Sequence, residues 1–177
     1  MSIKNIIVAG TPQLRQPAKI VPLTWFGTLE AQQLIEELFA TMQARQGVGL
    51  AAPQINVPLR VLVYGFEMNA RYPDQAPVPR TLMVNPKIIH ASEEKVYLYE
   101  GCLSLPEIRG LVPRHEWIEV EAQDKQGKIF QNRYQGFEAR IIQHEIDHLE
   151  GKLYPERMDN MRTLGVTAAL REAGLIR

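Results

Sequence analysis

The stretch QHEIDH at residues 143–148 decides how the rest of the chain is interpreted. If it is helical, His144 and His148 lie four residues apart on one face, with Glu145 beside them. Two neutral imidazoles in this arrangement can bind one divalent metal ion, and the adjacent carboxylate can take a proton from water bound to that ion. The five-residue pattern alone fits a surface helix with two chance histidines equally well.

The composition favours one globular domain. The chain has 177 residues, of which 45% are hydrophobic and 23% charged, so it can bury one substantial core and we expect a single domain over residues 1–177. Twenty basic residues balance twenty acidic ones. This balance excludes a global field that would draw the protein to nucleic acid or to a membrane surface, although it leaves room for a local basic patch. No stretch approaches the ~18 apolar residues of a membrane span.

The cysteine content and the N-terminus bear on localisation. Cys102 is the only cysteine, so no intramolecular disulfide can form and a reducing compartment is expected. The first ten residues lack the apolar core of a signal peptide and the Arg- and Ser-rich character of a transit peptide. We therefore expect a cytoplasmic enzyme of bacterial type, or an organellar protein whose presequence has been removed.

The first part of the chain predicts an irregular arm followed by a helix. Prolines at positions 12, 17 and 22 disfavour a long regular element before Thr24. From Thr28 to Arg45, apolar residues recur at helical spacing with polar residues between them, which predicts an amphipathic helix packed on the core. Gly47 is expected to end this helix as its C′ residue.

The stretch GVGLAAPQ at residues 47–54 is rich in small residues. Its backbone can be approached closely, so it can offer main-chain N–H and C=O groups to a peptide, while the Gln54 amide can donate to a developing oxyanion. A tight turn whose small residues only permit close packing is the alternative. A phosphate-binding loop is excluded because the lysine and hydroxyl of G-x-x-x-x-G-K-[ST] are missing.

The middle of the chain has the composition and period of β-strands. Strands are expected over residues 59–66, 82–89, 95–99, 112–122 and 128–134. Three prolines between residues 71 and 80 predict a loop there. A turn at 124–127, with Gly127 as its last residue, would make the last two strands antiparallel neighbours.

Helical spacing returns near Phe137 and leads into the QHEIDH stretch, so that stretch should lie on a largely buried helix packed against the sheet. A short last helix is expected over Met161–Glu172. No internal repeats or low-complexity tracts occur.

The stretch EGCLS at residues 100–104 contains the single cysteine, which could be a third metal ligand. A thiolate and two imidazoles leave the fourth tetrahedral position open for water, which is typical of a catalytic rather than a structural metal site. An inert buried thiol is the alternative interpretation of Cys102. The two remaining histidines, His90 and His115, fit surface or strand packing better than metal binding.

Three stretches together, residues 47–54, 100–104 and 143–151, resemble the motifs G-x-G-x-A-A-x-Q, E-G-C-x-S and Q-H-E-x-D-H-x-x-G of the peptide deformylase family. Their order and approximate spacing match as well, and the resemblance covers roughly residues 5–160. It implies an α+β fold in which antiparallel β-sheets pack around the C-terminal-half helix that carries H-E-x-x-H, with another helix near the N-terminus. The implied activity is metal-dependent hydrolysis of the formyl group from N-formylmethionyl peptides, which releases formate.

The resemblance also implies roles for single residues. The metal ligands would be Cys102, His144 and His148. Glu145 is similar to the general base and acid of the family, and Gln54 and the backbone N–H of Leu103 are similar to its oxyanion donors. On the substrate side, Gly49 would contact the peptide backbone and Val48 would line the methionine pocket. Glu100 would support the metal ligands, and Arg109 would be the arginine that grips the substrate.

One divalent metal ion per chain is expected as cofactor. Ligand softness favours zinc for a tetrahedral site of one thiolate and two imidazoles. The resemblance instead implies Fe(II) as the physiological ion, with Zn, Ni or Co in a purified sample. The implied partners are the N-formylmethionyl peptide and, transiently, the ribosome, while monomer and dimer both stay open.

Two other functions compete with this interpretation. A zincin-type metallopeptidase also uses H-E-x-x-H, but it takes its third ligand downstream and has no use for an E-G-C motif upstream. A non-catalytic, metal-stabilised binding module would use the ligands for folding only. Such a module would tolerate Glu145→Ala, whereas an enzyme would not.

Overall fold

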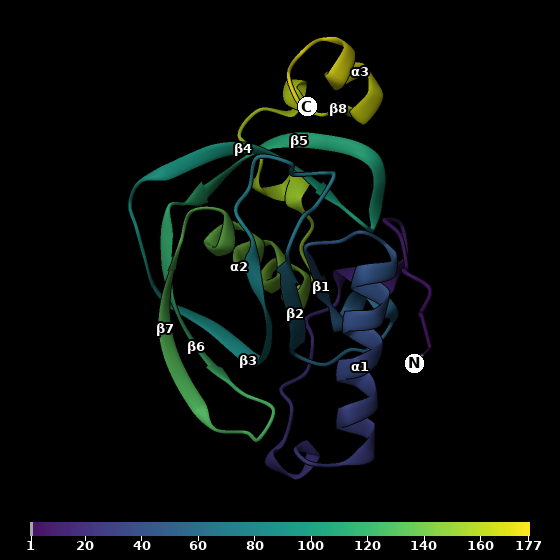
Figure 1. Cartoon of the computed structure of the whole chain (residues 1–177), viewed down its shortest axis with the longest axis vertical. Coiled ribbons are helices and arrows are strands. Elements are labelled where there is room, and N and C mark those ends of the chain that lie inside the picture. Colours follow the sequence, from purple (N-terminus) through teal and green to yellow (C-terminus); the bar gives the residue numbers. More distant parts are fainter. Residues whose placement is uncertain (1) are drawn as a thin grey trace.

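The computed structural model describes residues 2–177 and confirms the α+β fold, with two antiparallel sheets arranged around helix α2 (Gly136–Leu149). Figure 1 shows α2 near the centre of the molecule, with β4 and β5 passing over one side of it and the larger sheet curving around the other. The larger sheet has the order β1-β2-β3-β6-β7 and the smaller one β4-β5-β8.

The strands of the larger sheet are β1 (Gly49–Ala51), β2 (Val61–Phe66), β3 (Val78–Ala91), β6 (Trp117–Gln123) and β7 (Ile129–Gln135). Those of the smaller sheet are β4 (Lys95–Cys102), β5 (Leu105–His115) and β8 (Gly165–Val166). All neighbouring strands in both sheets run antiparallel. The remaining α-helices are α1 (Leu29–Ala44) and α3 (Thr167–Glu172).

The N-terminal arm and α1 follow the sequence prediction apart from one detail. From residue 2 onward, the arm has two short 3₁₀ turns, at Pro12–Arg15 and Leu23–Trp25, and an isolated β-bridge between Lys19 and Leu59. Helix α1 begins after Thr28, whose side chain accepts a hydrogen bond from the Ala31 N–H and so caps the helix. The prediction that Gly47 is the C′ residue is wrong by one position, because Gln46 adopts the left-handed conformation with φ 53°.

Gly47 is required for a different reason. Its N–H donates to the Met42 carbonyl at 2.9 Å, which places it one residue beyond the left-handed position of the helix end. A Cβ at Gly47 would lie 2.9 Å from Cδ1 of Leu103. The glycine therefore lets the end of α1 approach the residue that follows Cys102.

Several predicted strand boundaries are corrected by the structure. The loop predicted at 71–80 ends before Val78, where β3 begins. The single strand predicted over 112–122 is wrong, since Glu116 separates β5 from β6 and these strands belong to different sheets. Between Arg114 and Ala122 no glycine or proline marks this break, and only the packing of two sheets makes the chain change direction here.

The small-residue stretch at 47–54 also differs from a simple turn. Gly49–Ala51 forms strand β1, which pairs with β2, and a 3₁₀ turn follows at Ala52–Ile55. Because β1 is first in the sheet order, its outer side has no strand neighbour within residues 2–177. Apart from the Ala51 N–H, which donates to Gln54 Oε1, main-chain groups on that side have no strand partner, and their contact with a peptide stays a prediction.

The predicted hairpin and the predicted last helix have different outcomes. The turn at 124–127 joins β6 to β7, and Gly127 has φ +81°, so this prediction is confirmed. The helix predicted over Met161–Glu172 is wrong in its first half. A 3₁₀ turn at Met161–Thr163 and strand β8 precede α3, because Gly165 and Val166 pair with β5.

The apolar core lies on both sides of the larger sheet. Ile142, Ile146 and Leu149 of α2 pack in one buried cluster with residues of β2, β3 and β6. Leu34, Leu38 and Met42 of α1 belong to a second cluster on the opposite side. No helix within residues 2–177 combines the length and the apolar character that crossing a membrane requires.

Candidate metal centre

Three predicted ligands meet at the end of β4. Cys102 is the last residue of this strand, and His144 and His148 lie one turn apart on α2. One ligand atom from each residue lies within 4.8 Å of the other two, and Cys102 Sγ is 3.2 Å from His148 Nε2. Within residues 2–177 this is the only such cluster of three His, Cys, Asp or Glu side chains.

The donor chemistry of this cluster fits one divalent ion. Burial raises the pKa of the Cys102 thiol, but the charge of His148 and hydrogen bonding to both histidines outweigh burial and hold the pKa well below its ordinary value. The thiolate is the form that binds metal. One thiolate and two imidazoles leave a fourth tetrahedral position, as expected for a catalytic site.

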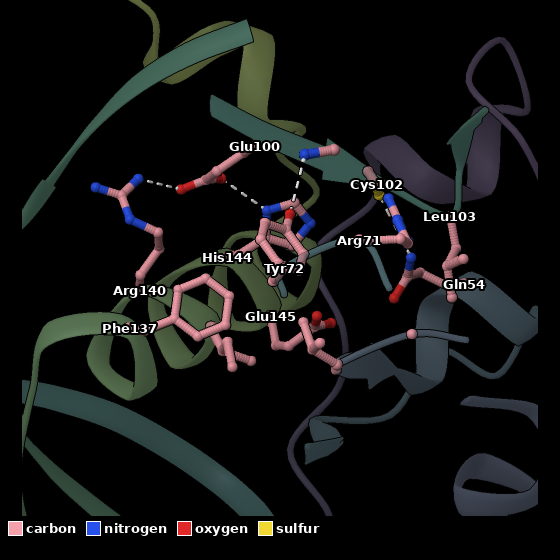
Figure 2. Close-up of a pocket in the computed structure, with 15 residues that line it drawn as sticks. Gln54, Arg71, Tyr72, Glu100, Cys102, Leu103, Phe137, Arg140, His144 and Glu145 are labelled. Carbon is pink, nitrogen blue, oxygen red and sulfur yellow. Dashed lines mark hydrogen bonds and ion pairs between the residues drawn. The ribbon is translucent and has the colours of Figure 1, made fainter. Parts of the chain in front are cut away.

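Glu100 orients one of the candidate ligands. Its Oε2 lies 2.9 Å from His144 Nδ1, which leaves His144 Nε2 as the atom available to a metal. Arg114 makes two hydrogen bonds to this carboxylate, at 2.9 and 3.0 Å, and Arg140 makes another at 2.7 Å. Figure 2 shows the line from Arg140 through Glu100 to His144.

The same arginines keep Glu100 ionised. Burial opposes its charge, but Arg114 and the hydrogen bond to His144 outweigh burial, so the pKa of Glu100 lies far below its ordinary value. With both oxygens occupied by these partners, the Glu100 carboxylate supports His144, although its side chain also lines the cleft. A buried carboxylate in this position fixes both the tautomer and the orientation of the imidazole.

Glu145 lies in the cleft beside the candidate ligands. It is 4% exposed, and its Oε2 has no hydrogen-bond partner among residues 2–177. Burial raises the pKa of Glu145 to about 7, although the charges of His144 and His148 act in the opposite direction. A carboxylate with this pKa can both accept and donate a proton near neutral pH.

Gly49 of β1 provides the space that Glu145 occupies. A Cβ at this position would overlap Oε1 and Cδ of Glu145. Because both atoms belong to a buried side chain, any larger residue would displace the carboxylate. The requirement for glycine in this motif is therefore steric and concerns the cleft itself.

Gln54 points its amide N–H₂ at the ligand cluster. Its Oε1 accepts a hydrogen bond from the Ala51 N–H at 2.9 Å, and this fixes which end of the side chain faces Cys102. Its Nε2 lies 3.6 Å from Cys102 Sγ and 3.2 Å from Ser104 Oγ. A donor held in this way is suited to stabilising negative charge on a substrate oxygen.

The cleft itself is small, with a volume of about 40 Å³. Figure 2 shows residues from β1, β4, α2 and the loop before β3 lining it. The sequence predicted several of the lining residues, namely Val48, Gly49, Gln54, Glu100, Cys102, Leu103, His144 and Glu145. Val48 is partly buried beside the apolar core, as a residue in a methionine pocket would be.

Other lining residues were missed by sequence reasoning. Phe137 and Ile141 were assigned only to the apolar spacing of α2, yet they line the cleft. Arg71 and Tyr72 come from the proline-rich loop, which had no functional signal. Tyr72 packs on Phe137 with ring centroids 4.8 Å apart, a long-range contact that no local pattern could have identified.

Arg109 lies outside the small cleft, in a neighbouring groove that also contacts Cys102 and Leu103. Its guanidinium carbon lies 5.0 Å from the centre of the Tyr72 ring, and its Nη2 donates to the Arg71 carbonyl at 3.3 Å. His90 and His115 do not join the ligand cluster. His115 Nδ1 instead lies 2.5 Å from the Ser92 carbonyl.

Comparison with known proteins agrees with this geometry. The sequence model of the polypeptide deformylase family matches residues 3–163. Peptide deformylase 1 of Bordetella pertussis is 45% identical over 168 residues, which cover 95% of this chain and 94% of the relative. Peptide deformylase 2 of Pseudomonas putida is 44% identical over 168 residues, with the same shares of 95% and 94%.

Solved structures are similar over nearly their whole length. The class I type b peptide deformylase from Acinetobacter baumannii with bound Met-Ala-Ser has a TM-score of 0.86 and 39% identity, covering 89% of this chain and 99% of that chain. The peptide deformylase from Thermotoga maritima has a TM-score of 0.77 and 34% identity, covering 90% of this chain and 100% of that one.

Proposed function

This chain belongs to the polypeptide deformylase family, and on that premise we propose which of its side chains carry the reaction. The family assignment makes it a metal-dependent hydrolase that removes the N-formyl group from nascent peptides. One observation above all supports the assignment of roles. Cys102, His144 and His148 converge beside a cleft that also holds the unpartnered carboxylate of Glu145.

We propose that Cys102, His144 and His148 hold one divalent ion. When bound, such an ion acts as a Lewis acid, which polarises a carbonyl and lowers the pKa of water towards about 7. The lowered pKa of Cys102 supports this assignment, as does the hydrogen bond that His144 Nδ1 donates to Glu100, which leaves His144 Nε2 available.

Glu145 is proposed as the general base and then the general acid. It takes a proton from the attacking water as the new C–O bond forms at the formyl carbon. It then gives that proton to the amide nitrogen as the C–N bond breaks, so that formic acid and a free amine leave. The formic acid then loses its proton to water and becomes formate. A pKa of about 7 suits both steps at neutral pH.

Gln54 and the backbone N–H of Leu103 are proposed as the donors to the oxygen that becomes negatively charged. The hydrogen bond from Ala51 that orients Gln54 supports this role. Gly49 is proposed to contact the peptide backbone, Val48 to line the methionine pocket, and Arg109 to grip the substrate beyond the first residue. We further propose that residues 1–177 act as one catalytic domain.

We propose Fe(II) as the physiological ion, as the motif resemblance implies, although the donor set also suits zinc. Anaerobic purification followed by metal analysis and metal exchange tests this assignment. Activity should be higher with Fe or Ni than with Zn, and equal activity with Zn would count against it.

A cytoplasmic location and transient contact with the ribosome are also proposed. The presence of one cysteine, the bacterial origin of the relatives and a substrate made during translation support both proposals. Cosedimentation with translating ribosomes, compared with empty ribosomal subunits, tests the contact.

The deciding experiment is formate release from a formyl-Met-Ala-Ser peptide by the wild-type protein and by Glu145→Ala. Because Glu145 is not a proposed ligand, the variant should retain one metal ion per chain while its activity falls by at least about 10²–10⁴-fold. Full activity in Glu145→Ala would favour a site in which metal serves folding only. Cleavage of an unformylated internal peptide would favour the zincin alternative.

A further inference from the structure

A second, larger groove opens beside the metal centre. Its volume is about 700 Å³, and it shares Arg71, Cys102 and Leu103 with the small cleft. A peptide whose formyl group lies at Cys102 can therefore extend into this groove. The charged side chains that line it are Arg45, Arg71, Arg109, Arg171 and Glu107. We call this site the arginine groove.

Within residues 2–177, none of the four arginines forms a salt bridge to an Asp or Glu side chain. The Nε of Arg171 donates a hydrogen bond to the main-chain oxygen of Arg177 at 3.1 Å. Arg109 is only 4% exposed, and burial together with the charges of Arg71 and Arg171 lowers its pKa. Glu107 is exposed and offsets only part of the positive charge. The groove therefore presents uncompensated positive charge at the exit of the metal cleft.

The C-terminal segment builds one wall of the arginine groove. Strand β8 pairs with β5, with Gly165 opposite Arg109, and Leu170 of α3 is buried. Figure 1 shows this segment lying over β5. Thr167, Ala168 and Arg171 of α3 line the groove. These residues lie beyond residue 163, where the match to the family model ends.

We propose that the arginine groove binds acidic side chains at the first or second residue after formylmethionine, and that the protein deformylates such peptides preferentially. This inference rests on the proposed function. A free C-terminal carboxylate has the same chemistry, but a growing nascent chain has none near its N-terminus. Carboxylate side chains are therefore the natural ligands for these guanidinium groups.

The test compares two series of C-terminally amidated peptides. The first is formyl-Met-Ala-Glu-Ser, formyl-Met-Ala-Gln-Ser and formyl-Met-Ala-Lys-Ser. The second carries Glu, Gln or Lys directly after methionine. At low ionic strength, kcat/KM should be about 5–10-fold higher for Glu than for Lys in at least one series, with Gln between them. The difference should shrink at about 0.5 M salt, because exposed charges are then screened.

Variants of the groove arginines test whether the groove causes this preference for acidic residues. Arg171→Gln and Arg45→Gln should each lower the Glu-to-Lys ratio by about twofold, and the double variant should bring it close to one. Arg162→Gln is the matched control, since Arg162 is an exposed arginine of the same tail that does not line the groove. This control should keep the wild-type ratio.

The outcomes separate this inference from the proposed function. Formate release at equal rates from the Glu, Gln and Lys peptides overturns the acidic preference and leaves the deformylase assignment intact. A preference that survives the double variant overturns the role of the groove. A gain seen only for free-acid peptides over their amides shows recognition of a chain end instead of a side chain. If no peptide releases formate, the proposed function fails and this inference fails with it.

Discussion

Helix α2 has two faces that are equally buried and opposite in chemistry. On one face, Ile142 and Leu149 are fully buried in the apolar core on the larger sheet. On the other face, Arg140 and His148 are 5% and 1% exposed, yet they face Glu100 and Cys102 of β4. A helix with a polar side normally turns that side to water. Here the smaller sheet covers it.

The two faces are stabilised by different interactions. The apolar face gains free energy from each side chain roughly in proportion to the area removed from water. The polar face gains only when every charge has a partner, since an unpaired buried charge costs several kcal/mol. Arg114 illustrates this dependence, because it joins Glu100 at 2.9 Å and Asp147 at 2.6 Å. Burial of the charges on the polar face therefore costs free energy of folding, and their pairing holds the site in a defined geometry.

The largest effect should come from His148→Ala on the polar face. Loss of one of three ligands should reduce the metal content well below one ion per chain and lower activity by about 10³-fold or more. The adjacent Leu149→Met on the apolar face is the control. It conserves volume, so it should keep metal and activity and cost less than about 1.5 kcal/mol. Metal analysis beside formate release checks both, and full metal content in His148→Ala would contradict the ligand assignment.

Gln54→Leu should have the second-largest effect on activity, because Gln54 faces the polar side of α2 but is not one of the proposed metal ligands. Removal of one oxyanion donor typically lowers kcat about 10²–10³-fold. The variant also leaves the Ala51 N–H without its acceptor, which should cost about 1–3 kcal/mol of stability. Steady-state kinetics on metal-loaded protein, with thermal unfolding as the control, tests this. A kcat within a few fold of wild type would exclude Gln54 from the reaction.

Ile142→Ala probes the apolar face, and it should lower stability while leaving kcat nearly unchanged. Its side chain is fully buried, so the substitution should lower the free energy of unfolding by about 2–5 kcal/mol. The folded fraction should retain a kcat within about twofold of wild type, because the polar face keeps all of its partners. Urea unfolding and active-site titration measure the two quantities. A large fall in kcat of the folded enzyme would show that the two faces are coupled.

The smallest effect is expected at Glu37, which lies on α1 outside both faces. Burial opposes its charge, but hydrogen bonds from Gln33 and Lys4 outweigh burial and lower its pKa. A folded-state pKa below the unfolded value of about 4.3 stabilises the protein above that pH, and the contribution disappears as the pH falls.

Glu37→Gln should therefore lower stability at pH 7 by less than about 1 kcal/mol. It should also flatten the loss of stability between about pH 5 and pH 3. Urea unfolding across this range checks the sign. A variant that loses stability on acidification as steeply as wild type would show that Glu37 contributes nothing to the acid response.

Much of the candidate site could be predicted because its signals are local. The four-residue spacing of His144 and His148 follows from helix geometry, and the small residues at 47–54 reflect close approach, which the overlap of any Cβ at Gly49 with Glu145 explains. The hairpin at 124–127 was equally local. Arg71, Tyr72 and the groove wall at Arg171 could not be predicted, because loop and tail residues reach the site only through long-range packing.

The sequence by itself determined the period of α2 and therefore which of its residues share a face. Only the tertiary structure decided that both faces are buried. Periodicity depends on neighbours along one helix, whereas burial of the polar face depends on β4 and β5 bringing Glu100 and Arg114 to within hydrogen-bond distance of His144 and Asp147. For the same reason the segment at 112–122 had to divide between two sheets, since β5 covers α2 from one side and β6 belongs to the sheet on the other.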